Sequence, residues 1–378
     1  MVKATNASSM KEKNKRLILN LIRQNNFSRA EIAKETNLTK AAVTIIMEDL
    51  INDGLVLESK AEYTGLGRRP IILKLNPKAM MAVGLNLTRN YAEMGIVNIE
   101  GKIICEKKFD VYPKSKAIEE IEENIGKMIT ENNIADDSIY GIGITAPGLV
   151  DVQNTTILNP PNFNEWHYEN IGLRLKDISD KNVYLENISG GITLCEKYFG
   201  IAKKMKNFLV LIVDDGIGSG IMTSGCLFRK ASELGHTSIA FDGIKCECGN
   251  FGCVEKYASI PAILKGTNYK SWQEVIDSND EKVIEKEAEY LSCAIINAAN
   301  LFSVENVILE GGINYNPHKI INLIEEKLKR NRIVKKTPKV LSGSSYRGAV
   351  CAADLFLTII LNKNYFVYTI KPAPKLSV

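Results

Sequence analysis

The chain has 378 residues, 45% of them hydrophobic and 24% charged, which is the composition of a soluble globular protein with two or three domains. Its apolar runs are too short to cross a membrane, and its amino terminus lacks the apolar stretch of a signal peptide. Five of the eight cysteines are scattered and show no disulfide framework. We therefore expect a cytoplasmic protein without a membrane partner.

The net charge of +4 is unevenly distributed along the chain. Residues 1–76 contain 13 Lys and Arg against 8 Asp and Glu, and the remaining residues contain 35 against 36. The positive excess therefore lies in the amino-terminal fifth, where it favours a polyanionic partner such as DNA.

The first predicted helix covers residues 11–26. Leu17, Ile18, Leu21 and Ile22 recur at helical spacing, so we expect them to share one buried face.

Two shorter helices are predicted next. Ser28 with Glu31 forms a capping box for a helix over residues 29–36, and Thr39 caps a third helix that ends at Gly54. The predicted buried face of the third helix consists of Val43, Ile46, Met47, Leu50 and Ile51. Two short helices joined by a tight turn indicate a helix-turn-helix.

Strands are predicted at residues 55–58 and 71–75, around a loop with paired arginines on a glycine-flanked tip. Such a wing suits contact with phosphates or the minor groove. The predicted DNA contacts are Arg29, Lys40, Thr44, Arg68 and Arg69. An alternative is that this basic helical segment binds another protein and no DNA.

The pattern changes after residue 80. Strands are predicted at residues 83–87, 93–98, 102–107 and 139–144, with a helix over residues 118–132. Strand-rich hairpins with intervening helices indicate an α/β fold for this part of the chain.

A metal site is predicted further along. His236, Cys246, Cys248 and Cys253 follow one another at spacings of ten, two and five residues. One imidazole and three thiolates in a short segment suit a closed, tetrahedral and structural zinc site, one ion per chain. The glutamates at positions 233 and 255 flank this cluster, so a bound metal would also fix their backbone.

The chain resembles the ROK family (repressors, open reading frames and sugar kinases) at this cluster. The motif Cys246-x-Cys248-Gly249-x-x-Gly252-Cys253-x-Glu255 follows Glu233-Leu234-Gly235-His236, and the resemblance extends from about residue 80 onward. It implies a two-lobed, actin-like (ribonuclease-H-like) sugar-kinase fold. The amino-terminal segment resembles the winged helix-turn-helix domain of the family's NagC/XylR-type repressors, which its kinases lack.

The resemblance also implies a sugar site. Residues 159–163 read Asn-Pro-Pro-Asn-Phe and match a family loop near the sugar, as do residues 141–151. By resemblance, the sugar-binding residues are Asn162, Asn187, Glu233, His236 and Glu255.

The chain departs from the family's kinases at three places. Residues 86–90 read Asn-Leu-Thr-Arg-Asn where kinases have Asp-x-Gly-Gly-Thr for the ATP phosphates. Residues 214–218 read Asp-Asp-Gly-Ile-Gly, and these carboxylates would repel a polyphosphate. Ile188 follows Asn187 where kinases have a catalytic aspartate, and isoleucine cannot act as a base. We therefore expect no catalytic residues.

The expected domains are a winged helix-turn-helix at residues 1–78 and two lobes at residues 79–190 and 191–344. By resemblance, a carboxy-terminal helix over residues 345–362 returns to the first lobe, and residues 363–378 form a tail.

These observations predict a sugar-responsive DNA-binding regulator, specifically a repressor of carbohydrate-utilisation genes that is not an enzyme. Its expected partners are a palindromic double-stranded DNA operator, a small-molecule sugar effector and a second copy of the chain, as a homodimer or dimer of dimers. The alternative is an active ATP-dependent sugar kinase with a fused DNA-binding domain.

Overall fold

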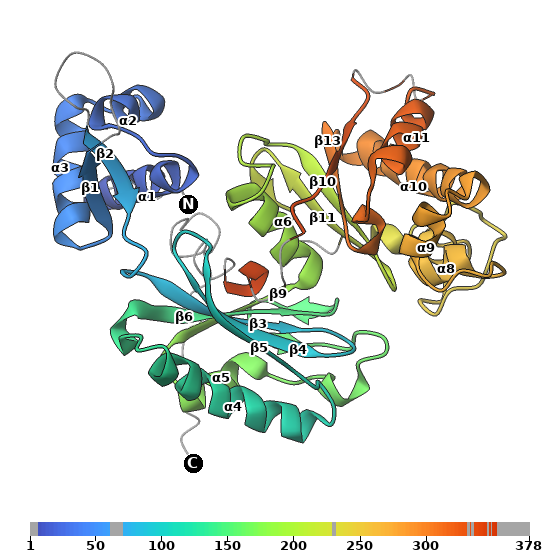
Figure 1. The fold of residues 1–378 in the computed structure, drawn as a ribbon, viewed down its shortest axis with the longest axis horizontal. Helices are drawn as coiled ribbons and strands as arrows, with labels where there is room; N and C mark the ends of the chain where they lie inside the picture. Colours follow the sequence, from blue (N-terminus) through green and yellow to red (C-terminus); the bar gives the residue numbers. More distant parts are fainter. Residues whose placement is uncertain are drawn as a thin grey trace. The chain divides into compact units, whose positions relative to one another are not determined.

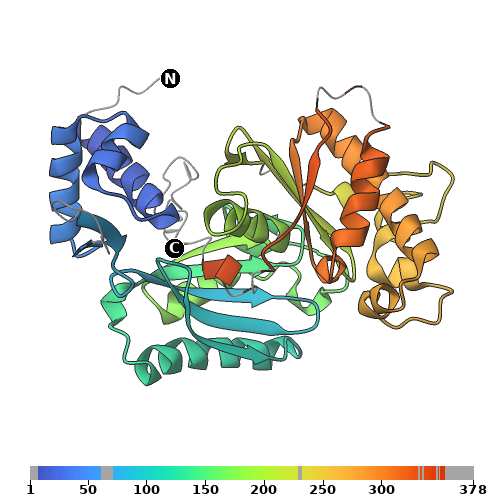
Figure 2. The same ribbon diagram turned by 45° about the horizontal axis from the view of Figure 1, so that its top comes forward.

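The computed structural model describes residues 7–60, 71–228, 232–330, 333, 336–345, 348 and 350–353. The chain divides into two compact units (Figures 1 and 2). The first consists of Met1–Asn187 with Gly348–Val378, and the second is Ile188–Arg347. Among the described residues, no helix combines the length and the apolar character that a membrane span requires.

The first unit begins with three helices and a two-stranded antiparallel sheet (Figure 1). The helices are α1 (Ala7–Gln24), α2 (Arg29–Thr36) and α3 (Lys40–Asn52), and the strands are β1 (Val56–Lys60) and β2 (Ile71–Leu75). The predicted order of three helices followed by two strands is confirmed, and α2 with α3 forms the predicted helix-turn-helix.

Side-chain caps set the ends of α2 and α3. The Ser28 hydroxyl accepts a hydrogen bond from the Glu31 N–H, and the Glu31 carboxylate accepts one from the Ser28 N–H at 2.8 Å, so the predicted capping box is present. Asn37 ends α2 in the left-handed conformation at φ 56°. Thr39 Oγ1 then accepts from the Ala42 N–H at 3.2 Å and starts α3. These local bonds fix the tight turn between the two helices.

The buried face of α1 differs from the prediction. Ile18, Leu19 and Ile22 are buried, whereas Leu17 is 46% exposed. Because successive helical residues are about 100° apart, a face centred between Ile18 and Ile22 includes Leu19 and excludes Leu17. On α3 the predicted face is buried at four positions, and Ile51 is only partly buried.

A five-stranded sheet forms the body of the first unit, in the order β5-β4-β3-β6-β9. Its strands are β3 (Met81–Leu87), β4 (Ala92–Asn98), β5 (Ile103–Phe109), β6 (Ile139–Ala146) and β9 (Asn182–Asn187). β3, β4 and β5 are antiparallel, whereas β6 pairs in parallel with both β3 and β9. β3 is buried at every position, as expected for a strand covered on both faces.

Helix α4 (Lys114–Glu131) runs along one face of this sheet (Figures 1 and 2), and its apolar residues join the strand residues in one buried cluster. It starts four residues before the predicted helix. The other short elements of the unit are η1 (Asp136–Ser138), β7 (Val150–Asp151), β8 (Thr156–Ile157), η2 (Asn164–Trp166) and α5 (Ile171–Ile178). Most of them lie in the connection between β6 and β9, which also carries the loop predicted to contact sugar.

A second five-stranded sheet forms the second unit, in the order β12-β11-β10-β13-β14. Its strands are β10 (Phe208–Val213), β11 (Ile217–Thr223), β12 (Cys226–Leu227), β13 (Asn306–Glu310) and β14 (Lys339–Ser342). β10, β13 and β14 are parallel, so their carboxyl ends meet at the same edge. In α/β sheets this edge is where ligands bind.

The helices of the second unit are of two kinds. The long ones pack on the sheet and include α6 (Ile188–Tyr198), α10 (Glu281–Phe302) and α11 (His318–Leu328). The short ones are η3 (Leu234–His236), α7 (Glu255–Ala258), α8 (Ile260–Leu264), α9 (Trp272–Asp277) and η4 (Gly312–Asn314). Apolar residues of β10, β13, α10 and α11 form one continuous core.

One carboxylic acid lies inside this core. Glu287, on α10, is 0% exposed, and neither of its carboxyl oxygens has a hydrogen-bond partner among the described residues. Burial therefore raises the pKa of Glu287 well above its ordinary value of 4.5. Burial therefore favours the neutral acid in the folded protein, whereas the carboxyl group ionises at its ordinary pKa in the unfolded chain.

We expect the free energy of unfolding of Glu287→Gln to increase relative to that of the wild type as the pH rises above about 4.5. Because the folded-state pKa is raised, the wild type loses stability with rising pH, by up to about 1.4 kcal/mol for each pH unit, until the folded protein also ionises. Urea unfolding of both proteins between pH 5 and 8 measures the difference. Glu285→Gln, at a side chain that is 67% exposed on the same helix, is the control. If the difference in unfolding free energy between Glu287→Gln and the wild type does not change with pH, the prediction is wrong.

Candidate functional site

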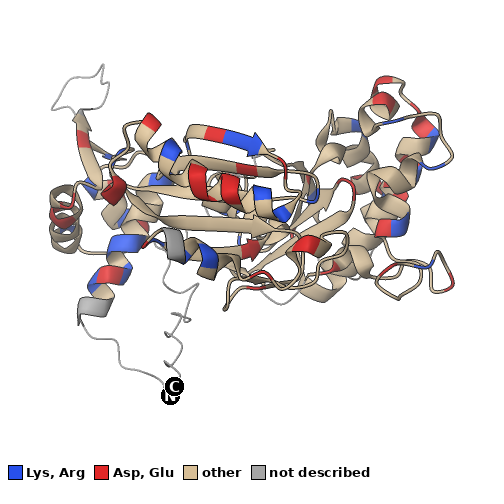
Figure 3. Ribbon diagram, turned by 90° about the horizontal axis from the view of Figure 1, so that it is seen from below, with Lys and Arg blue, Asp and Glu red and all other residues tan. Residues whose placement is uncertain are grey.

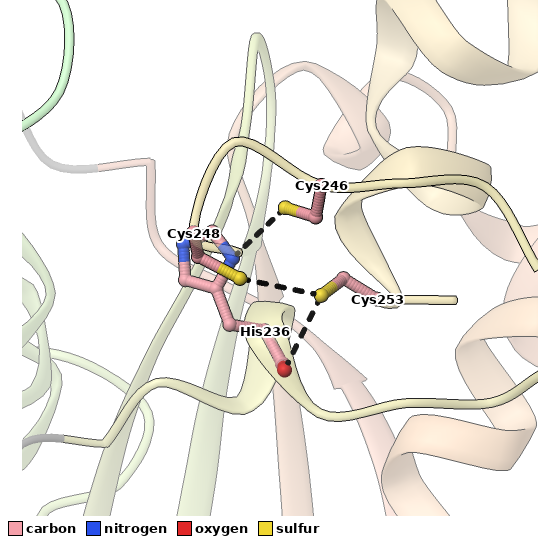
Figure 4. Close-up of side chains that lie close together, drawn as sticks. All are labelled: His236, Cys246, Cys248 and Cys253. Carbon is pink, nitrogen blue, oxygen red and sulfur yellow. Dashed lines mark hydrogen bonds between the residues drawn. The ribbon is translucent and has the colours of Figure 1, made fainter. Parts of the chain in front are cut away.

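The four predicted metal ligands lie close together in the second unit (Figure 4). His236 ends η3, and the three cysteines follow in the loop that leads to α7. The four ligand atoms all lie within 4.8 Å of one another. His236 Nδ1 is 3.6 Å from Cys246 Sγ, and Cys248 Sγ is 3.6 Å from Cys253 Sγ.

These distances fit a tetrahedral ion. Ligands about 2.3 Å (sulfur) and 2.0 Å (nitrogen) from one zinc lie about 3.5–3.8 Å apart. Burial and then the Cys248 side chain raise the pKa of Cys253 to about 12, whereas hydrogen bonding, above all from the Asn250 backbone, lowers the pKa of Cys248. A cation is the group that would stabilise thiolates at such close range.

The knuckle between the ligands is shaped by its backbone. The Cys246 N–H donates to Asn250 O at 2.8 Å, and the Gly249 N–H donates to Cys246 O at 3.0 Å. Gly249 has φ 92° and Gly252 has φ 68°. A Cβ atom on Gly252 would lie 1.6 Å from Ala240 O, so only glycine fits there. The turn therefore brings the cysteines on its two sides together.

The two flanking glutamates are attached directly to this segment. Glu255 is the first residue of α7, and its Oε2 accepts a hydrogen bond from the Ile217 N–H at 2.9 Å. Its Oε1 makes no hydrogen bond to any described residue. Glu233 is exposed and immediately precedes η3. The Glu255 bond ties the metal segment to the turn between β10 and β11.

The predicted sugar residues are divided between the units. Asn162 and Asn187 belong to the first unit, whereas Glu233, His236 and Glu255 belong to the second. Asn162 is exposed and has φ 56°. Asn187 is the last residue of β9, and its N–H donates to Glu186 Oε1 at 2.9 Å.

The positions where kinases carry their phosphate and base residues have different chemistry here. Asn86 is buried on β3, and its Oδ1 accepts from Thr145 Oγ1 at 2.8 Å. A Cβ atom on Gly348 would lie 1.9 Å from Asn86 Nδ2, so the backbone of residue 348 covers this amide. Ile188 is the first residue of α6, directly after Asn187.

The carboxyl edge of the second sheet is acidic. Asp214 follows β10, and the backbone N–H groups of Gly312 and Asp215 near its carboxyl group act to lower its pKa. Desolvation and the neighbouring Asp215 carboxylate raise the pKa of Asp214. At the end of β13, burial and then Glu196 raise the pKa of Glu310 to about 8. This edge carries acids at the places where a polyphosphate would need donors.

The residues predicted to contact DNA differ in their exposure and in their hydrogen-bond and ion-pair partners. Lys40 is exposed at the start of α3, and Thr44 Oγ1 donates to Lys40 O at 2.9 Å. Arg29 Nη2 lies 2.8 Å from Glu58 Oε1, so this guanidinium already has an ion-pair partner. Arg68 and Arg69 lie outside the described residues. In the view of Figure 3, basic and acidic residues are interspersed along the helices.

One residue of this surface was missed in the sequence. Ile45 is 54% exposed on α3, next to Thr44 and one turn from the exposed Ala41. Its position outside the buried face of Val43, Ile46, Met47 and Leu50 could have been found from the helical period. An exposed methyl-bearing side chain on the helix that carries Lys40 and Thr44 can contact a thymine methyl group.

Comparison with known proteins places the chain in a family. The ROK family model matches residues 82–358. The xylose repressor of Bacillus spizizenii is 31% identical over 336 residues, which are 84% of this chain and 87% of the repressor. The DNA-binding transcriptional dual regulator NagC of Escherichia coli is 27% identical over 94% of this chain and 95% of its own length.

Solved structures share the fold. A ROK family transcriptional regulator, described as a homolog of the E. coli MLC protein, has a TM-score of 0.78 at 24% identity and covers 93% of this chain and 97% of its own. A ROK glucokinase from Streptomyces griseus, in complex with glucose and AMPPNP, has a TM-score of 0.61 at 23% identity and covers 73% of this chain and 98% of its own. The chain therefore belongs to the ROK family.

Proposed function

We propose that the protein is a cytoplasmic, sugar-responsive transcriptional repressor of carbohydrate-utilisation genes that binds a palindromic operator as a homodimer. The observation that carries this proposal is the share of the chain that each relative matches. NagC and the solved regulator match more than nine-tenths of the chain, helix-turn-helix included, whereas the glucokinase matches about three-quarters. The amino-terminal domain is thus what this chain shares with regulators.

We propose further that the ROK domain has no kinase activity. Catalysis would need a base at position 188, and isoleucine supplies none. The buried Asn86 amide oxygen accepts a hydrogen bond from Thr145, and the Gly312 N–H lies near the Asp214 carboxyl group. An ATP-dependent sugar kinase would have to replace all three features, so ligand binding without reaction is the function these residues support.

The cluster of His236, Cys246, Cys248 and Cys253 is proposed to hold one structural zinc per chain. Support comes from the donor set and from distances that match the edges of a zinc tetrahedron. With four protein ligands the ion would have no position for water, so its role would be to stabilise the loop that carries Glu233 and Glu255.

We expect purified protein to contain one zinc per chain and Cys248→Ser to lose it. Because a structural ion contributes directly to folding, the variant should be several kcal/mol less stable. Plasma mass spectrometry and urea unfolding, without chelators, measure the two effects. Cys226→Ser, at an exposed cysteine outside the cluster, should change neither. A zinc-free wild type would contradict the assignment.

The DNA-reading surface is proposed to be the exposed side of α3, with Lys40, Thr44 and Ile45. Lys40 suits a base-edge or phosphate contact, and Ile45 suits a thymine methyl. Arg29 is proposed to exchange its Glu58 partner for a DNA phosphate. Arg68 and Arg69 remain proposed contacts of the wing.

We expect Lys40→Ala and Ile45→Ala each to cost roughly 1–3 kcal/mol of discrimination at one base position of the operator. Neither should weaken binding to unrelated DNA as strongly. Fluorescence anisotropy on the operator and its single-base variants measures this, with salt titrations to count phosphate contacts. Lys265→Ala removes one exposed positive charge from the second unit and is the control. Equal weakening on all sequences would show that the two residues do not read bases.

The effector is proposed to bind through Asn162, Asn187, Glu233, His236 and Glu255. Amides and carboxylates are suited to sugar hydroxyls, and Glu255 keeps one carboxyl oxygen available after bonding to Ile217. His236 would bind zinc through Nδ1, the nitrogen nearest Cys246, and leave Nε2 for the sugar. Binding at these residues can favour one conformation of the protein over another.

We expect the effector sugar to weaken operator binding, with a coupling of about 1–3 kcal/mol. Titration of the operator with and without each of D-xylose, N-acetyl-D-glucosamine and D-glucose measures this coupling. Glu255→Gln keeps an acceptor for the Ile217 N–H and should abolish the response. Glu326→Gln, an exposed glutamate on α11, should leave it intact. Operator affinity that no sugar changes would overturn the regulatory proposal.

A further inference from the structure

The first unit contains an open hollow of about 360 Å³ beside the predicted sugar residue Asn162. Tyr112, Asn162, Asn164 and Glu165 line it. All four residues belong to the first unit, and neither the sequence motifs nor the family match assigns a role to Tyr112, Asn164 or Glu165. Two chain segments form the hollow, the connection from β5 to α4 and the loop around η2.

The floor beneath these residues is rigid. Phe163 and Trp166 are both 0% exposed, and their rings stack with centroids 5.6 Å apart and an interplanar angle of 7°. Trp166 Nε1 donates a hydrogen bond to Val111 O at 3.2 Å. Two buried rings and this bond attach the η2 loop to the segment before α4, so the exposed residues of the loop are held in place before any ligand binds.

The walls are fixed by three further contacts. Glu165 Oε2 accepts from the Lys114 N–H at 2.8 Å, and so serves the first turn of α4, which has no side-chain cap of its own. The Tyr112 ring packs edge-on against Phe163, with centroids 6.1 Å apart. The Tyr112 hydroxyl donates to Asn162 O at 3.5 Å, a long bond that a ligand can replace.

The Glu165 bond by itself has a purely structural explanation, because a carboxylate is favourable at a helix start. That explanation uses only one oxygen, and Glu165 Oε1 has no hydrogen-bond partner among the described residues. It also leaves Asn164 unexplained. Asn164 is exposed, and its side-chain amide makes no hydrogen bond within the described chain.

The hollow therefore offers two amides, a phenol and one carboxylate oxygen around an aromatic ring. Together they can donate and accept several hydrogen bonds, and Arg89, whose Nε donates to Pro161 O at 2.9 Å, lies near Tyr112. Desolvation and the Glu165 carboxylate raise the pKa of Tyr112, so its hydroxyl keeps its proton. An uncharged, polyhydroxylated ring is the ligand class that matches this set.

We propose that this hollow selects the effector sugar, with Asn164, Glu165 and Tyr112 contacting hydroxyl groups in addition to those bound by Asn162. The inference rests on the proposed sugar-binding function and names the residues that distinguish one sugar from another. A sugar that lacks the matching hydroxyl, or carries it in the opposite configuration, leaves one of these groups without its partner.

The test is isothermal titration of the full-length protein with D-xylose, D-glucose, D-galactose, D-mannose and N-acetyl-D-glucosamine. For the sugar that the wild type binds best, Asn164→Ala and Glu165→Gln should each raise Kd roughly tenfold. Both should also reduce the preference for that sugar over its epimers. Tyr112→Phe, which removes only the hydroxyl, should have a smaller effect of the same kind.

The controls separate selection from folding. Glutamine at position 165 still accepts the Lys114 N–H, so the start of α4 is kept. Asn182→Ala removes an exposed asparagine at the opposite end of β9 from Asn187 and should bind every sugar as the wild type does. Operator affinity without sugar should be unchanged in all variants, which a folding defect would not allow.

The outcomes distinguish this inference from the proposed function. If Asn187→Ala and Glu255→Gln lose sugar binding while the Asn164 and Glu165 variants keep wild-type affinity and preference, the hollow is not part of the site and the inference is wrong. If the wild type binds none of the five sugars, the proposed effector function and the inference are both overturned. Weakened binding with a changed preference among epimers supports both.

Discussion

The segment from Glu233 to Glu255 must bring one imidazole and three thiols to a single point, and much of the chemistry of the second unit depends on that constraint. Between η3 and α7 the backbone has only isolated bridges, Ser238 with Cys253 and Lys245 with Phe251, and no continuous ladder. Hydrogen bonds between single residue pairs hold this loop, for example from the Ile239 N–H to Gly252 O at 2.8 Å, and an ion among its ligands would add to its stability. The two glutamates leave from its ends, and Glu255 also bonds to the β10–β11 turn.

In this chain Ile188 stands where the resemblance to the family's kinases places the catalytic aspartate. At the carboxyl edge of the second sheet, the Asp214 carboxyl group lies near the Gly312 N–H, and Glu310 and Glu196 form a buried acidic pair at the end of β13. Carboxylates at this edge would oppose a polyphosphate when they are ionised, but they would not repel an uncharged sugar. Binding energy that is not used for catalysis can change the populations of two conformations, which is what a regulator requires.

The amino-terminal domain carries the DNA-binding part of the regulator, and a small apolar core holds it together. Ile18, Ile32, Val43, Met47 and Leu73 are fully buried, so the three helices and the two-stranded sheet enclose one apolar centre. Because these residues complete the apolar core, the side chains on the exposed side of α3 are not needed for packing. Ile45 is the clearest sign of this, because an isoleucine that is 54% exposed contributes little to folding.

The sequence by itself determined the features that depend on neighbours a few residues away. Local chemistry predicts the Ser28–Glu31 capping box and the Thr39 cap, and the sequence also shows the order of strands along the chain and the spacing of the cysteines. Ile188, at the position where the resemblance places a catalytic aspartate, is likewise read directly from the sequence. Contacts between distant residues were decided only by the tertiary structure. Glu165 meets Lys114 across 51 positions of sequence, and Arg29 meets Glu58 across 29. No local pattern encodes such pairs, because which distant side chains meet depends on how whole elements pack, and that packing also buried Leu19 in place of Leu17.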